Sequence, residues 1–229
     1  MKEIKVLITG TGRCGTVYFA NLLSSIGIPC GHEAIFTPDG LDEAINRLEN
    51  PSLIKFSECT SKLPKWAESE SIVADSSYMS APFLSQDILS NTKIIHLVRH
   101  PIKVIRSFVN ANYFNNNWPA HTVPYQKFIK DNIPHIYDNN LDNANRAALY
   151  YIEWNKLIEK NIINKEHIFH KIEDSDEIVC NFLNKKIANE KIDNKINSWV
   201  NTKEININQF DSKIKKDIKD IILKYNYNE

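Results

Sequence analysis

The stretch Lys5-Val6-Leu7-Ile8-Thr9-Gly10-Thr11-Gly12-Arg13-Cys14-Gly15-Thr16-Val17 decides the fold of this chain. Its apolar run from Val6 to Ile8 is typical of a buried strand, and three glycines follow within six residues. An apolar helical pattern then begins at Val17. Glycines let a backbone approach a ligand closely, and the N-terminus of a helix attracts anions. The stretch therefore predicts a strand, an anion-binding loop and a helix.

The spacing of Gly10 and Gly15 matches the first part of a nucleotide-binding phosphate loop, but the next two residues do not. A loop that binds Mg-ATP continues with Lys and then Ser or Thr, whereas Thr16 and Val17 stand here. The cation lies inside the loop instead, at Arg13. We expect a phosphate or sulfate cradle without equipment for Mg-ATP. The plain alternative is a tight turn between a strand and a helix.

Length, composition and charge predict one well-cored domain over residues 1–229. The chain is 42% hydrophobic and its formal net charge is +0, so no global field draws it to nucleic acid or anionic membranes. No apolar run approaches the ~20 residues of a spanning helix, and we expect no membrane span. Four cysteines without metal-ligand spacing indicate a reduced, cytoplasmic protein: Cys14, Cys30, Cys59 and Cys180.

Strand and helix patterns alternate along the chain. Strands are predicted at 4–9, 71–75, 93–99 and 167–172, with an extended piece at 28–33. Helices are predicted at 16–26, 41–48, 145–160, 176–183 and 213–225, with another beginning at Pro101. The alternation predicts an α/β, P-loop-like three-layer fold, with a mainly parallel sheet flanked by helices. Segment 110–140 is broken by prolines and is predicted as a lid or substrate loop with a short helix near 125–131.

Polar side chains stand where the predicted strands end. Arg13 follows the first strand, Asp75, Ser76 and Ser77 follow the next, and Arg99 ends the third. Ligands of parallel α/β sheets bind at the carboxyl ends of the strands, so we expect these residues to form one site. Asp75, Ser76 and Ser77 are predicted to line the pocket of a second substrate, or to cap a turn.

Two segments together resemble the sulfotransferases that use 3′-phosphoadenosine 5′-phosphosulfate (PAPS). Thr9–Val17 is similar to the family's 5′-phosphosulfate loop, with Cys14 in place of its common serine. Lys93–Phe108 looks like the family's 3′-phosphate element, a strand ending in Arg99 with Ser107 in the next helix. The resemblance implies these cofactor-binding residues: Gly12, Arg13, Cys14, Gly15, Thr16, Val17, Arg99 and Ser107.

A third segment, Cys30-Gly31-His32-Glu33, is similar to the Gly-Glu pair of tyrosylprotein, carbohydrate and bacterial sulfotransferases. The resemblance implies that Glu33 is the catalytic base and that Arg13 stabilises charge on the transferring group. It also implies PAPS as donor, 3′-phosphoadenosine 5′-phosphate (PAP) as product and no metal. His32 is a rival base, and a helix-entry or solvated carboxylate is the alternative for Glu33. The acceptor would be a small molecule, glycan or lipid that offers a hydroxyl or amine, and a sugar, a lipid headgroup, a phenol and a peptide tyrosine are all open.

Two other functions fit parts of the sequence. A small-molecule or nucleotide kinase could use a degenerate phosphate loop, and a non-catalytic module could bind a nucleotide without reacting it. The absence of Lys and Ser or Thr after Gly15 argues against the kinase. The kinase also offers no clear role for Arg99 and Ser107.

Overall fold

The computed structural model describes residues 3–54, 72–115, 122–137, 140–187 and 204–228. Cys59, the first residue of the strand predicted at 71–75 and parts of the predicted lid fall outside these ranges.

The contacts of the chain group into two compact units. The sheet unit consists of Met1–Val98 and Ile158–Asn197, and the helical unit consists of Arg99–Leu157 and Ser198–Glu229. One sulfotransferase-like domain over 1–229 stays a prediction, as does a lid at 110–140.

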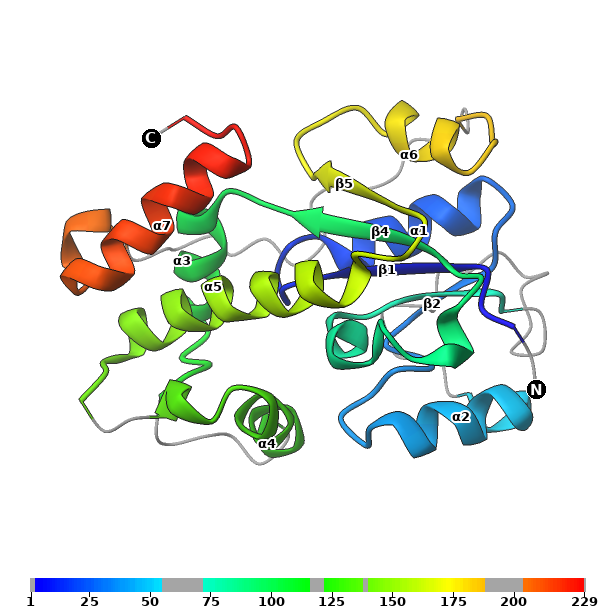
Figure 1. Cartoon of the computed structure of the whole chain (residues 1–229), viewed down its shortest axis with the longest axis horizontal. Helices are drawn as coiled ribbons and strands as arrows, with labels where there is room; N and C mark the ends of the chain where they lie inside the picture. Colours follow the sequence, from blue (N-terminus) through cyan, green and yellow to red (C-terminus); the bar gives the residue numbers. More distant parts are fainter. Residues whose placement is uncertain (1–2, 55–71, 116–121, 138–139, 188–203, 229) are drawn as a thin grey trace. The chain divides into compact units, whose positions relative to one another are not determined.

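The sheet unit is built on five parallel strands (Figure 1). Their order across the sheet is β2 (Cys30–His32), β3 (Ala74–Ser76), β1 (Val6–Gly10), β4 (Lys93–Val98) and β5 (His167–Lys171). Every residue of β1 is buried, as expected for an apolar strand paired on both sides. The prediction of an α/β fold with a parallel sheet flanked by helices is confirmed.

The register of the strands sets which residues meet at the carboxyl edge of the sheet. Ile8 of β1 lies opposite Ser76 of β3, and Ser76 in turn lies opposite His32 of β2. The chain therefore leaves β1, β2 and β3 at neighbouring points on this edge. The loop that follows β1 and the segment that follows His32 both start there.

The sheet unit also holds helices: α1 (Thr16–Ser25), α2 (Leu41–Glu49) and α6 (Glu177–Phe182), and 3-10 helices at Pro51–Leu53, Tyr78–Phe83 and Asp87–Leu89. Of these, α1, α6 and the 3-10 helix at Tyr78–Phe83 contact strands of the sheet. Phe19 and Leu23 of α1 enter the same core cluster as Ile8, as the 3.6-residue spacing predicts. The hydroxyl of Tyr18 donates to Asp176, ahead of α6, at 2.5 Å.

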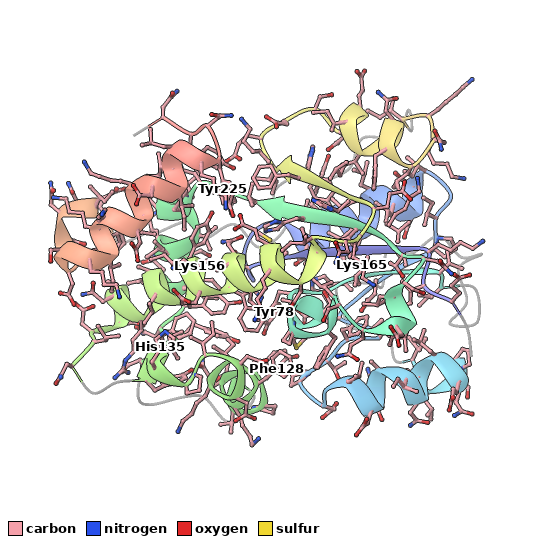
Figure 2. All side chains as sticks on the ribbon, viewed as in Figure 1. Tyr78, Phe128, His135, Lys156, Lys165 and Tyr225 are labelled. Atoms are coloured by element: carbon pink, nitrogen blue, oxygen red, sulfur yellow. The ribbon has the colours of Figure 1, made fainter. Side chains whose placement is uncertain are left out.

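The connection into β5 is also fixed within the sheet unit. Lys165, labelled in Figure 2, donates from Nζ to the backbone oxygen of Leu89 at 3.1 Å. The backbone oxygen of Glu166 accepts from the N–H of Ile94 at 2.9 Å. The second contact places the start of β5 alongside β4, and the first ties it to the 3-10 helix that precedes β4.

The helical unit has an aromatic core. Its elements include α3 (Pro101–Asn110), α4 (Val123–Asn132), a 3-10 helix at Pro134–Tyr137, the first part of α5 (Asn143–Ile162), a 3-10 helix at Ile207–Gln209 and α7 (Ser212–Lys224). Tyr150 of α5 lies 5.2 Å, between ring centroids, from Phe108, Phe114 and Trp154. Phe128 of α4, labelled in Figure 2, also packs on Trp154. The helices predicted at 145–160 and near 125–131 are thus present.

Within the described ranges, no helix combines the length and the apolarity that crossing a membrane requires.

Gly10 lies where β1 closely approaches both the β4 backbone and the loop. A Cβ at this position would lie 2.5 Å from the backbone oxygen of Leu97 and 2.6 Å from Sγ of Cys14. We expect Gly10→Ala to lower the free energy of unfolding by about 2–3 kcal/mol, because the β4 backbone cannot yield without loosening the sheet. Equilibrium urea unfolding measures the loss.

Gly27→Ala is the matched control. Unlike Gly10, Gly27 has a left-handed backbone, φ 82°, but no atom of the described residues lies within 4 Å of the point where an alanine Cβ would stand. Only left-handed strain of about 1 kcal/mol is expected there. Equal losses in the two variants would show that contact with β4 does not require glycine at position 10.

Candidate active site

The glycine-rich loop turns sharply before α1. Arg13 has φ 68° and Gly15 has φ 102°, both left-handed. A side chain at Gly15 would collide with Ile172, whose Cδ1 lies 2.2 Å from the position of an added Cβ. The N-cap residue of α1, Gly15, has no side chain to cap the helix, and the first turn of α1 holds no acidic residue. The first N–H groups of α1 and the positive end of its dipole are therefore suited to bind an anion.

Left-handed conformation marks both residues predicted to be catalytic. Within the described part of the chain, the non-glycine residues with positive φ are Arg13, Glu33 and three asparagines. Asparagine adopts this conformation readily, whereas other L-residues lose about 1–2 kcal/mol. Arg13 has φ 68° and Glu33 has φ 52°. Backbone strain of this kind persists only where the surroundings impose it, and it is frequent at functional sites.

A short polar chain joins the loop to the Glu33 carboxylate. Thr16, the first residue of α1, has its Oγ1 hydrogen bonded to Nε2 of His32 at 3.1 Å. The same His32 Nε2 lies 3.9 Å from Oε1 of Glu33. Ser76 adds a second link, since its hydroxyl donates to the backbone oxygen of Thr16 at 2.8 Å and its backbone oxygen accepts from the Glu33 N–H at 3.2 Å. The start of α1 and the end of β2 are thus held together.

The two candidate bases have opposite pKa shifts. Burial, and secondarily the charge of Asp75, raise the pKa of Glu33 to about 7. Burial lowers the pKa of His32 to about 4, so His32 is neutral near pH 7. The Glu33 side chain is 20% exposed and that of His32 is 10% exposed. Glu33 is therefore the group whose pKa suits proton transfer near neutral pH.

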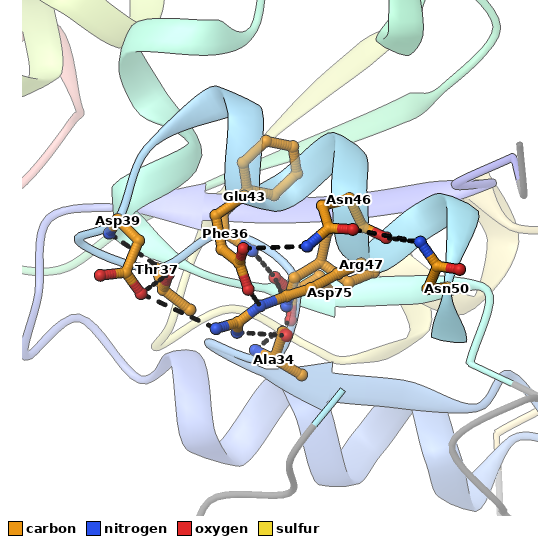
Figure 3. A network of polar contacts seen from close by, with 10 residues as sticks. Ala34, Phe36, Thr37, Asp39, Glu43, Asn46, Arg47, Asn50 and Asp75 are labelled. Carbon is orange, nitrogen blue, oxygen red and sulfur yellow. Dashed lines mark hydrogen bonds and ion pairs between the residues drawn. The ribbon is translucent and has the colours of Figure 1, made fainter. Parts of the chain in front are cut away.

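Asp75, Ser76 and Ser77 are fully buried, and each side chain is hydrogen bonded to backbone. The Asp75 carboxylate accepts from three successive N–H groups that follow Glu33, as Figure 3 shows. The Ser77 hydroxyl donates to the backbone oxygen of Phe36 at 2.8 Å. It also accepts from the N–H of Met79, which caps the 3-10 helix as the turn alternative expects. Contact of these residues with a second substrate stays a prediction.

The other predicted cofactor residues lie in two places. Cys14 is buried in the loop, and Val17 is half-buried in the first turn of α1. Arg99 directly follows β4 and belongs to the helical unit, where its backbone oxygen accepts from the Tyr151 hydroxyl at 2.7 Å. Ser107 lies in α3, which begins at Pro101 as predicted. Binding of phosphate by these residues stays a prediction.

Sequence reasoning missed Arg47 of α2. Its Nη1 donates to the backbone oxygen of Ala34 at 3.0 Å, and its Nε donates to Glu43 at 2.8 Å. The i,i+4 spacing of Glu43 and Arg47 was the available signal, but it indicates only a pair on a helix surface. It does not reveal that the arginine also reaches the segment after Glu33.

Comparison with known proteins identifies a domain. Residues 5–198 match the family model described as a sulfotransferase domain. Among curated proteins, none matches this chain. Solved structures similar to it include a sulfotransferase from Alicyclobacillus acidocaldarius, 11% identical, with 100% of this chain and 98% of that chain covered and a TM-score of 0.46. Another is the sulfotransferase domain from the curacin biosynthetic pathway, 15% identical, with 82% and 76% covered and a TM-score of 0.43.

The raised pKa of Glu33 predicts how stability depends on pH. The folded state favours the protonated form, so the native protein loses stability as pH rises from the ordinary pKa of about 4.5 to the folded pKa of about 7, and loses no more above it. We expect Glu33→Gln to gain stability relative to the native protein as pH rises from about 4.5 to about 7, by on the order of 2 kcal/mol, and to keep that gain above. Urea unfolding at a series of pH values measures the difference.

Glu43→Gln is the matched control with the opposite sign. Its hydrogen bond from Arg47 lowers the pKa of Glu43, so the ionised form stabilises the fold. That variant should be less stable than the native protein at pH 7, with the difference shrinking as pH falls. A Glu33→Gln profile parallel to the Glu43→Gln profile would contradict the assignment of a raised pKa to Glu33.

Proposed function

This chain belongs to the sulfotransferase domain family, and we propose that it transfers a sulfuryl group from PAPS to a hydroxyl or amine of an acceptor. The contact series from Thr16 through His32 to Glu33 carries this proposal. It connects a helix N-terminus that is suited to an anion with a carboxylate whose pKa lies near 7. An acceptor activated at Glu33 would then meet a donor held at the loop.

The donor's 5′-phosphosulfate binds to the glycine-rich loop in this proposal. The backbone N–H groups of residues 12–17 and the Thr16 hydroxyl donate to its oxygens, and Arg13 stabilises charge on the transferring group. The family resemblance implies that Arg99 and the Ser107 hydroxyl bind the 3′-phosphate. The guanidinium of Arg99 offers paired donors for it. No metal is required, because the loop and the arginines supply the positive charge.

The chemical step is an in-line displacement. The acceptor oxygen or nitrogen attacks sulfur, and a new bond to sulfur forms as the bond from sulfur to the 5′-phosphate oxygen breaks. That oxygen keeps the electron pair and leaves as PAP. The acceptor proton passes to the Glu33 carboxylate. His32, neutral and bonded to Thr16, orients the loop hydroxyl rather than taking the proton.

The acceptor remains a class rather than a compound. A small molecule, a glycan or a lipid headgroup with a free hydroxyl or amine satisfies the chemistry proposed for Glu33. The donor can be tested first, because its binding does not depend on the acceptor.

PAP binding tests the donor. We expect PAP to raise the free energy of unfolding by roughly 2.7 kcal/mol at 100 times its dissociation constant, with no effect of Mg-ATP at the same concentration. Thermal-shift measurements report both. Arg99→Ala should weaken PAP binding by about tenfold or more and leave adenosine 5′-monophosphate binding nearly unchanged.

Lys156→Ala is the control, since Lys156 is an exposed cation of the helical unit (labelled in Figure 2) that pairs with Glu153. If Arg99→Ala weakened the binding of PAP and of adenosine 5′-monophosphate equally, Arg99 would not be a ligand of the 3′-phosphate. Stabilisation by Mg-ATP alone would refute the donor assignment and favour the kinase.

The pH dependence of turnover tests the base. With radiolabelled PAPS and an acceptor found in a panel of phenols, sugars and lipids, kcat should rise with pH through a midpoint near the Glu33 pKa of about 7. Glu33→Gln should lower kcat by about 100-fold or more while PAP still binds. A kcat that is flat above pH 5 would fit the lowered pKa of His32 and make His32 the base.

A further inference from the structure

One buried carboxylate holds the segment that directly follows Glu33. Asp75 Oδ1 accepts from the N–H of Ala34 at 3.0 Å, and Oδ2 accepts from Ile35 at 3.1 Å and Phe36 at 3.0 Å. Three successive N–H groups converging on one carboxylate form a backbone anion nest inside the protein (Figure 3). Asp75 has no exposed surface, so water does not compete for these bonds.

The same segment is braced by two further side chains. Ser77, two residues after Asp75, donates from its hydroxyl to the backbone oxygen of Phe36 at 2.8 Å. Arg47 donates to the backbone oxygen of Ala34 at 3.0 Å from α2 (Figure 3). Gly31 leaves room for this packing, since a Cβ there would lie 2.4 Å from Cβ of Ala34 and 3.1 Å from Oδ1 of Asp75.

Glu33 joins this fixed segment to β2. Its backbone is left-handed, with φ 52°, and its N–H donates to the backbone oxygen of Ser76 at 3.2 Å. The residue before Glu33 is paired in the sheet, and the residues after it are bound to Asp75. With both sides fixed, the Cα–Cβ bond of Glu33 has a fixed direction, which sets where its side chain begins. A conformation that costs a glutamate free energy is thereby imposed on it.

We propose that Asp75 is a positioning residue for sulfuryl transfer: its carboxylate binds the 34–36 segment, fixes the Glu33 carboxylate and places a second negative charge beside it. The inference rests on the proposed role of Glu33 as base. Asp75 itself contacts backbone groups and acts through Glu33.

The charges around Glu33 agree with this role. Burial is the main cause that raises the pKa of Glu33, and the charge of Asp75 is the next. His32 is kept neutral by burial, which lowers its pKa. The Cys30 thiol is kept neutral too, since burial and the charge of Asp75 raise its pKa. Arg47 is engaged with Ala34, Glu43 and Asp39. Asp75 is thus the anion that biases Glu33 toward its protonated form.

Asp75→Asn tests both parts of the proposal by NMR, without reference to turnover. Losing the charge should lower the ¹³C-carboxyl titration midpoint of Glu33 by about 0.5 pH unit or more, with Glu33→Gln used to assign the signal. Losing acceptor capacity should speed amide exchange at Ala34, Ile35 and Phe36 by about tenfold or more. An unchanged midpoint, or unchanged exchange at these three amides, would overturn the proposal.

Two control variants separate charge from anchoring. Ser77→Ala removes a neutral brace from the same segment, so exchange near Phe36 should rise while the Glu33 midpoint stays fixed. Asp87→Asn removes an exposed carboxylate elsewhere in the sheet unit and should change neither. A shift of the Glu33 midpoint in Asp87→Asn equal to that in Asp75→Asn would show that the effect is not specific to Asp75.

A measurement on the native protein decides the matter if Asp75→Asn does not fold. The amide proton shifts of residues 34–36 should titrate together with the Asp75 carboxyl, whose pKa burial raises to about 6 against the effect of its backbone donors. If the amide proton shifts of residues 34–36 did not change as Asp75 titrates, the proposal would be overturned.

Turnover is read separately. In Asp75→Asn, kcat should fall while PAP affinity is unchanged, and the midpoint of the kcat profile should shift down with that of Glu33. If Glu33→Gln keeps full turnover, the base assignment fails while the NMR results still report on the bond between Asp75 and the 34–36 segment. If Glu33→Gln abolishes turnover but Asp75→Asn changes neither the Glu33 midpoint nor amide exchange at residues 34–36, the role of Asp75 fails while the base assignment stands.

Discussion

Parallel pairing of β1 with β3 on one side and β4 on the other is the constraint on which the rest of the sheet unit depends. The pairing buries Val6, Leu7 and Ile8 between two backbones and brings Ile8 level with Ser76. The glycine-rich loop therefore begins at the carboxyl edge of the sheet, where β3 ends. Gly10 allows the backbone oxygen of Leu97 to approach within a distance that any side chain would forbid.

The features that could be predicted from the sequence are those with local causes. An apolar run that ends in glycines identifies β1 and its loop, and the 3.6-residue spacing identifies α1 and α5. The candidate base Glu33 followed from a short motif and the resemblance it carries. The structure adds that Thr16 contacts His32 beside Glu33, which no local pattern indicates.

The features that could not be predicted have distant causes. Asp75 meets its N–H donors 39–41 residues back along the chain, and sequence gives no sign of which backbone groups a buried carboxylate will bind. The left-handed backbone of Arg13 and Glu33 was equally hidden, because glycine or asparagine would ordinarily mark such a position. Tertiary contacts impose these conformations, so the candidate site was predictable in its residue types and not in its geometry.

Two neighbouring carboxylates illustrate how the surroundings decide chemical roles. Burial raises the pKa of both Glu33 and Asp75. Asp75 receives three N–H donors, whereas among the described residues no hydrogen bond reaches the Glu33 carboxylate. Fixed N–H donors oppose protonation of a carboxylate and occupy its lone pairs, whereas a carboxylate with accessible lone pairs and a pKa near 7 can take a proton from a substrate. Asp75 is therefore suited to hold structure, and Glu33 to move a proton.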